Sequence, residues 1–89
     1  MTYNYQTERS NIFTEDGQVM FLKIRDRAHM LLEISGAAMM GDIIKECTGS
    51  SWTMIACVDR LVELKELLEV PNPHGRAGQF RIFIAGRSR

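Results

Sequence analysis

Apolar residues recur three and four positions apart in the first half of the chain, which is the spacing of one face of an α-helix. Thr14 is a suitable N-cap, and the two acidic residues after it favour the start of a helix. The apolar positions that follow at helical spacing are Met20, Ile24, Ala28, Leu31 and Leu32. Gly36 can take the left-handed conformation that ends a helix, so the pattern predicts an amphipathic helix over 14–35.

Two further helices are predicted after it, with a tight corner between them. The first is short, over 41–47, and Gly49 ends it. Ser50 or Ser51 caps the second, predicted over 51–65, whose apolar face consists of Met54, Cys57, Val58, Leu61 and Leu64. At about 100° per residue, the opposite face carries Trp52, Thr53, Ala56, Asp59, Arg60 and Glu63. This helix therefore has an apolar inner side and a polar outer side with one tryptophan.

The C-terminal part of the chain has the pattern of a β-hairpin. Residues 67–70 are short and apolar, 71–78 are dense in turn-forming residues, and 80–84 alternate with strong strand propensity. The alternation places Phe80, Ile82 and Ile84 on one face of the strand and Arg81 and Phe83 on the other. We therefore predict that Arg81 points away from the core.

The two ends of the chain lack these patterns. Residues 1–13 are polar with scattered aromatic side chains, and we predict a flexible arm or a segment that docks on a partner. Since 89 residues are about one small domain, a single domain is predicted over 14–85, followed by a basic tail over 86–89.

Composition places the chain among soluble globular proteins. Hydrophobic residues make up 45% of it and charged residues 25%. No run approaches the roughly 18 apolar residues of a membrane span, and the first residues lack the pattern of a signal peptide. We expect a cytoplasmic protein that does not bind a membrane.

The distribution of charge is more informative than its sum. Eleven basic residues balance eleven acidic ones, which does not favour nucleic-acid binding. Residues 71–89, however, contain four arginines and His74 with no carboxylate, whereas Glu63, Glu66 and Glu69 form an acidic band just before them. A DNA-binding face would have to avoid this band.

Metal binding and catalysis have little support in the sequence. Cys47 and Cys57 have no CxxC partner, and neither His29 nor His74 has a second ligand at metal-site spacing. The two thiols are expected to be small apolar fillers. No nucleophile elbow, HExxH pair or phosphate-binding loop is present, so we expect no enzyme and no cofactor.

Three helices followed by a hairpin, over 14–85, resemble the winged helix-turn-helix family of DNA-binding proteins. Ile44, Gly49, Ile55 and Val58 stand where the helix-turn-helix pattern has apolar, glycine, apolar and apolar residues. Lys45 replaces a residue that is usually small, and Lys65 replaces a frequent glycine. The resemblance implies an α+β, mostly α, fold with three helices and a C-terminal β-hairpin wing.

The resemblance also implies a way of binding DNA. The helix over 51–65 would enter the major groove, with Ser51, Trp52, Thr53, Ala56 and Arg60 as its readers. The wing over 71–81 would contact the backbone or minor groove through His74, Arg76, Gln79 and Arg81. Two alternatives stay open, because Arg60 could instead pair with Asp59 or Glu63, and Trp52 could pack on its own domain.

Two functional hypotheses follow. The first is sequence-specific binding of double-stranded DNA by a small transcriptional regulator, acting as a homodimer joined through the helix over 14–35 and the N-terminal arm, without a small-molecule effector. The second is a winged-helix module that binds protein, and not DNA. Zero net charge, the acidic band and Trp52 favour the second hypothesis.

Overall fold

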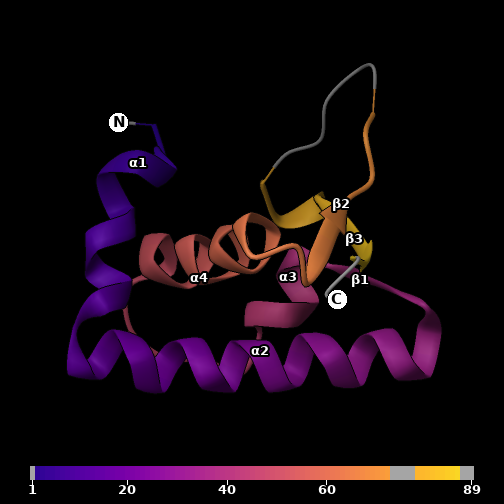
Figure 1. Ribbon diagram of the computed structural model, residues 1–89, viewed down its shortest axis with the longest axis horizontal. Helices are drawn as coiled ribbons and strands as arrows, with labels where there is room; N and C mark the ends of the chain where they lie inside the picture. The colour runs from indigo at the N-terminus through magenta and orange to yellow at the C-terminus, as the bar shows by residue number, and fades with distance from the viewer. Residues whose placement is uncertain (1, 73–77, 87–89) are drawn as a thin grey trace.

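A computed structural model describes residues 2–72 and 78–86 and shows an α+β fold that is mostly α (Figure 1). The fold class predicted from the sequence is confirmed at this level. In chain order, the elements are α1 (Tyr5–Glu8), the 3-10 helix η1 (Arg9–Phe13), α2 (Glu15–Ser35), β1 (Ala37–Met39), α3 (Met40–Ile44), α4 (Ser51–Glu63), β2 (Leu67–Glu69), the 3-10 helix η2 (Gly78–Phe80) and β3 (Ile82–Ala85). None of the helices described is both long and apolar enough to cross a membrane.

Helix α2 is the longest element, and the other elements lie along one side of it. The Thr14 hydroxyl accepts a hydrogen bond from the Gly17 N–H, and Gly36, at φ 78°, donates its N–H to the Leu32 carbonyl. The helix predicted over 14–35 is therefore confirmed together with both of its caps. In Figure 1, α2 runs along one edge of the molecule and the remaining elements lie on one side of it.

Helices α3 and α4 are joined by a turn that contains Gly49 at φ 115°. Ser50, one of the two predicted caps, accepts a hydrogen bond from the Thr53 N–H at the start of α4. The helix predicted over 51–65 begins where expected and ends two residues earlier, at Glu63. It packs against α2, and its buried residues are Met54, Ala56, Cys57, Val58 and Leu61.

The three strands form one antiparallel sheet in the order β1-β3-β2. Strand β3 is central, and Phe83 pairs with Ala38 of β1 and with Glu69 of β2. The sequence pattern does not predict β1, because its three residues, Ala-Ala-Met, show no alternation of apolar and polar side chains. The hairpin of β2 and β3 is as predicted, although its second strand begins at Ile82 and Phe80 belongs to η2.

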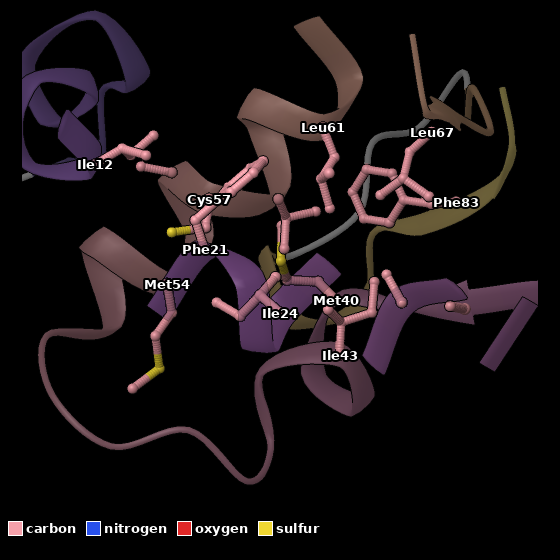
Figure 2. Close-up of a cluster of buried hydrophobic side chains, with 14 residues drawn as sticks. Ile12, Phe21, Ile24, Met40, Ile43, Met54, Cys57, Leu61, Leu67 and Phe83 are labelled. Atoms are coloured by element: carbon pink, nitrogen blue, oxygen red, sulfur yellow. The ribbon is translucent and has the colours of Figure 1, made fainter. Parts of the chain in front are cut away.

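The predicted facing of β3 is wrong. Phe83 is completely buried, whereas Ile84 is 40% exposed and Phe80, in η2, is 51% exposed. Each of the two faces of the predicted strand carries at least one large apolar residue. The alternation alone therefore could not show which face points inward. Packing decides it, because Phe83 lies in the buried cluster that contains Ala38 of β1 and Leu67 of β2 (Figure 2).

Residues 2–13 fold onto their own domain and are not a flexible arm. Asn4 caps α1, and its side-chain oxygen accepts from the N–H groups of Gln6 and Thr7. Ile12 of η1 is completely buried. Gly17 makes this packing possible, because a Cβ at Gly17 would overlap the carbonyl oxygen of Asn11.

One core joins all of these layers. Figure 2 shows Ile12 of η1 and Phe21 of α2 in the same apolar cluster as Leu61 of α4 and Phe83 of β3. The N-terminal segment is thus held by the same cluster that holds the sheet to the helices, and it is part of the folded domain.

The turn after α4 generates a prediction about stability. Lys65 has φ 67°, and it donates its N–H to the Val62 carbonyl while Glu66 donates to the Leu61 carbonyl, the hydrogen bonds of a glycine-type helix end. A side chain with a Cβ is strained there by about 1–2 kcal/mol. We expect Lys65→Gly to raise the free energy of unfolding by about 1 kcal/mol and the Tm by about 4–8 °C, measured by urea and thermal unfolding.

Lys65→Ala is the matched control for this substitution. It removes the charged side chain but keeps the Cβ, so the strain remains and we expect no gain in stability. An equal gain in both variants would show that the lysine side chain, and not its backbone angle, is the source of the effect.

Candidate functional site

The α4 residues that were predicted to contact DNA bases do not form one exposed surface. Ser51 is exposed, Trp52 and Thr53 are half-buried, and Ala56 is completely buried. The prediction for Ala56 is therefore wrong. The helical spacing of about 100° per residue placed Ala56 on the outer side of α4. The N-terminal segment packs against this side and covers it.

The N-terminal segment is attached to α4 by polar contacts as well as by Ile12. The Tyr3 hydroxyl donates to Asp59 Oδ2 over 2.7 Å, and the Tyr5 hydroxyl donates to Glu63 Oε1 over 2.8 Å. Arg9 Nε also donates to Glu63 Oε1, over 3.2 Å. Two carboxylates of the outer face of α4 thus serve as anchors for residues more than 50 positions earlier in the chain.

These contacts change the acidity of the groups involved. Partial burial, with the hydrogen bond to Glu63, raises the pKa of Tyr5 to about 12. The pKa of Tyr3 is also raised, chiefly by burial and then by its hydrogen bond to Asp59. The hydrogen bonds from Tyr5 and Arg60 lower the pKa of Glu63 to about 2. Both phenols are therefore held neutral, and Glu63 is held ionised, in the folded chain.

Arg60 is held within its own domain. Its Nη1 donates to Glu63 Oε1 over 2.8 Å, and its guanidinium lies 5.3 Å from the centre of the Phe13 ring. Of the two interpretations of Arg60, the structure favours pairing with Glu63 one turn later. The side chain is 23% exposed, so this arginine is not extended into solvent for a base or a phosphate.

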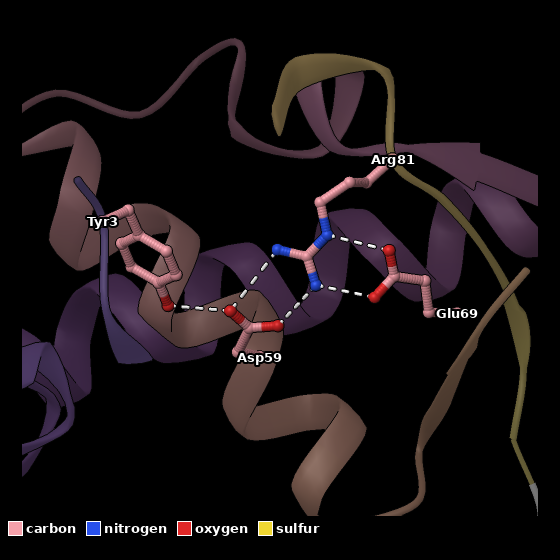
Figure 3. Close-up of polar contacts among 4 residues, drawn as sticks. All are labelled: Tyr3, Asp59, Glu69 and Arg81. Atoms are coloured by element: carbon pink, nitrogen blue, oxygen red, sulfur yellow. Dashed lines mark hydrogen bonds and ion pairs between the residues drawn. The ribbon is translucent and has the colours of Figure 1, made fainter. Parts of the chain in front are cut away.

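Arg81 lies between two carboxylates, as Figure 3 shows. Its Nη2 donates to Asp59 Oδ1 over 2.7 Å and to Glu69 Oε1 over 2.8 Å, and its Nε donates to Glu69 Oε2 over 2.9 Å. The hydrogen bonds to Glu69, followed by those to Asp59, raise its pKa further. The prediction that Arg81 points outward is wrong, because the side chain is 19% exposed and ties β3 to both α4 and β2.

The Arg81 contacts complete a chain of polar groups. Asp59 accepts from Tyr3 and from Arg81 at the same time (Figure 3). A bidentate pair such as that of Arg81 with Glu69 has a fixed geometry and adds specificity as well as energy. The N-terminal segment, α4 and the hairpin are therefore connected through one carboxylate.

The acidic band also has structural partners along its length. Glu66 accepts from His29 Nε2 over 2.9 Å and from Arg25 Nε over 3.0 Å, and these bonds lower its pKa although partial burial opposes ionisation. From the sequence, a DNA-binding face would have to avoid this band. In the structure its three carboxylates bind basic side chains of the same chain, namely Arg9 and Arg25, which stay 38% and 44% exposed, and Arg81, which is 19% exposed.

The predicted contacts of the wing are only partly described. His74 and Arg76 lie outside the described residues. Gln79 is exposed in η2, next to Phe80. Of the four predicted wing contacts, Arg81 is thus held by carboxylates and Gln79 is open to solvent.

The part of α4 that stays open carries no free cation. It contains exposed Ser51, half-exposed Trp52 and Ile55 at the edge of the core. Trp52 is not among the described side chains that pack against the buried core. We call Ser51, Trp52 and Ile55 the open face of α4, and it is apolar apart from one hydroxyl group.

An open hollow of about 520 Å³ lies beside the start of α4. It is bounded by the first turns of α2, the turn between α3 and α4, and Thr53. Its half-buried Cys47 is a free thiol, and the second thiol, Cys57, is buried with its pKa raised to about 12 by burial. Within the described part of the chain, no cluster of side chains is suited to a metal ion.

No protein-family model, curated protein or solved structure matched this chain. Function is therefore inferred from the residues and their geometry.

The N-terminal packing predicts a large cost for one substitution. Ile12→Ala should lower the free energy of unfolding by about 2–5 kcal/mol, because it removes completely buried methyl groups and leaves a cavity against α4. Phe13→Ala is the adjacent control. Phe13 is 50% exposed, so its loss should cost less than about 1 kcal/mol, chiefly its ring contacts with Arg9 and Arg60. Equal and small effects of the two substitutions in urea unfolding would mean that residues 2–13 do not pack as described.

Proposed function

We propose that this chain is a winged-helix domain. The order of the three helices α2, α3 and α4, followed by the β2–β3 hairpin, agrees with what the resemblance implies. A capped α4 after a tight turn at Gly49 supports the helix-turn-helix interpretation of α3 and α4. Lys65 at φ 67° also supports it, because many members place glycine at this position.

We further propose that the domain acts by binding another protein through the open face of α4. The observation that carries this proposal is the use of Arg60 and Arg81 within the fold, both held by carboxylates. The open face of α4 presents a serine, a tryptophan and an isoleucine to solvent. Aromatic side chains at the centre of a contact, with a polar rim, are typical of protein interfaces.

DNA binding by the same helix stays a prediction and has less support. Recognition of a duplex depends on cations that neutralise phosphates, and on arginine or amide side chains that reach base edges. On this domain, Arg60 and Arg81 would first have to leave Glu63, Asp59 and Glu69. The carboxylates left behind would then face the phosphates.

The first arm of the test is a measurement of DNA affinity. Fluorescence anisotropy with pooled random duplexes at low and moderate salt should give only weak, salt-sensitive binding, with a Kd no tighter than about 10⁻⁶ M. Sequence-specific binding with a Kd of about 10⁻⁸ M or tighter, lost in Arg60→Ala, would contradict the proposal.

The second arm looks for the protein partner in living cells. A photo-crosslinking amino acid is placed at exposed Ser51, with exposed Glu15 on α2 as the control position. We expect a nuclease-resistant crosslink at Ser51 alone, to one protein that mass spectrometry identifies.

Affinity for that purified partner then tests the contribution of Trp52. A buried interface tryptophan contributes about 2 kcal/mol or more, so Trp52→Ala should raise the Kd by at least about tenfold. Phe80→Ala removes another exposed aromatic side chain, away from α4, and should leave the Kd unchanged. Equal effects of the two substitutions would place the contact elsewhere.

A further inference from the structure

The side of α4 that carries Trp52 continues under the N-terminal segment. At about 100° per residue, Asp59 and Glu63 lie within about 20° of Trp52 around the helix, so the three residues form one stripe along α4. The Tyr3 hydroxyl donates to Asp59 and the Tyr5 hydroxyl donates to Glu63. We call Trp52, Asp59 and Glu63 the Trp52 stripe. Its first residue is open to solvent, and the other two are occupied by the N-terminal segment.

Residues 2–9, which we call the strap, are attached more weakly than the rest of the N-terminal segment. No residue of α1 is buried, whereas Ile12 of η1 is completely buried. Tyr3 and Tyr5 are half-buried, and the ion pair between the strap and α4 joins two side chains that are each 38% exposed. Segments with few buried apolar contacts and exposed hydrogen bonds open locally at a low cost in free energy. The strap is therefore able to leave α4 while Ile12 keeps its place in the core.

The strap also shows which chemistry this part of α4 accepts. Asp59 and Glu63 each accept a phenolic hydroxyl while they also bind an arginine of the domain, Arg81 and Arg60 respectively (Figure 3 shows Asp59). Both arginines belong to the fold beneath the strap, so they stay paired when the strap leaves. A neutral hydroxyl shares such a carboxylate by donating a second hydrogen bond without adding charge. The covered end of the stripe is thus suited to the tyrosine hydroxyls of an incoming segment.

We infer that the Trp52 stripe binds a tyrosine-bearing segment of the partner protein, and that the strap is an internal competitor for the same site. The inference rests on the proposed function and specifies the partner's chemistry and the control of access to α4. The partner's segment supplies hydroxyl donors to Asp59 and Glu63 and covers Trp52, which the strap leaves open. Release of the strap enlarges the contact surface. While the strap is bound, the apparent affinity is reduced in proportion to the fraction of chains that are open.

Opening of the strap is measured by amide hydrogen exchange in the full chain. The Glu8 N–H donates to the Asn4 carbonyl and reports on α1, whereas the amide of buried Leu61 reports on α4. We expect Glu8 to exchange at least about tenfold faster than Leu61, through local opening. In the double variant Tyr3→Phe with Tyr5→Phe, both hydroxyls are lost, so Glu8 should exchange about tenfold faster again. Unchanged exchange at Leu61 shows that the variant stays folded.

Binding to the stripe is tested with a synthetic peptide that has the sequence of residues 1–9. A tethered segment has an effective concentration of about 1 mM or more, so the peptide competes poorly with an intact strap. We expect the peptide to shift the amide NMR signals of Asp59 and Glu63 with an apparent Kd at least about tenfold lower in the double variant than in the unchanged chain. Thr7→Ala removes a different, exposed hydroxyl of the strap and should leave the apparent Kd as in the unchanged chain.

The chemistry of the site is tested with the same peptide phosphorylated on both tyrosines. Phosphorylation removes both hydroxyl donors and brings negative charge to Asp59 and Glu63. The phosphorylated peptide should therefore bind the double variant at least about tenfold more weakly than the unmodified peptide does.

The inference is overturned if Glu8 and Leu61 exchange at the same rate, if the peptide shifts no signal of α4 in the double variant, or if the phosphorylated peptide binds equally well. It is also overturned if the chain is a dimer that the peptide dissociates. The strap of a second copy is then the occupant, which is the part that the sequence assigned to the N-terminal arm in a homodimer. Failure to find a crosslinked partner at Ser51 counts against the proposed function alone, because the peptide measurements need no partner.

Discussion

Packing of residues 2–13 against α4 is the interaction on which the arrangement of the other elements depends. It buries Ile12 and Ala56 completely and brings Tyr3 and Tyr5 to the carboxylates of Asp59 and Glu63. Helix α4 is therefore covered by α2 on one side and by the N-terminal segment on another. Most of the outer surface that an isolated helix-turn-helix would present is used to hold the fold together.

The charge balance of the chain has a structural explanation in the same contacts. Glu63, Glu66 and Glu69 each bind basic side chains from other elements, and Asp59 binds Tyr3 and Arg81 together. Individual exposed ion pairs contribute little, but a network with bidentate geometry fixes how its elements sit against each other. The same network withdraws Arg60 and Arg81 from solvent. This use of both arginines within the fold is what supports the proposal that α4 binds a protein.

The parts of the fold that sequence could predict are those with local causes. Helix α2 and the start of α4 follow from caps at Thr14 and Ser50 and from regular apolar spacing. Strand β1 could not be found in this way, because its three small residues form a strand only when β3 lies beside them. The facing of β3 was likewise decided by its neighbours, since either phase of its alternation could have been buried.

The candidate site was predictable to a smaller extent for the same reason. Pairing of Arg60 with Glu63 is a contact three residues apart on one helix and was among the alternatives. The partners of Arg81 and the positions of Tyr3 and Tyr5 depend on contacts across 12 to 58 residues of sequence, which periodicity does not record. The scattered aromatic residues of the first segment are the only signal in the sequence for its packing, and they do not indicate where it packs.

Titration of the chain's two tyrosines by NMR tests the packing of the N-terminal segment most directly. An unperturbed phenol ionises near pH 10. If Tyr5 is held against Glu63, its pKa is about 12 and that of Tyr3, held against Asp59, is also raised. Because the folded state favours the neutral phenols, the stability they contribute is present below pH 10 and is lost as the pH rises above it. Two tyrosines that both ionise near pH 10 in the folded protein would contradict the account.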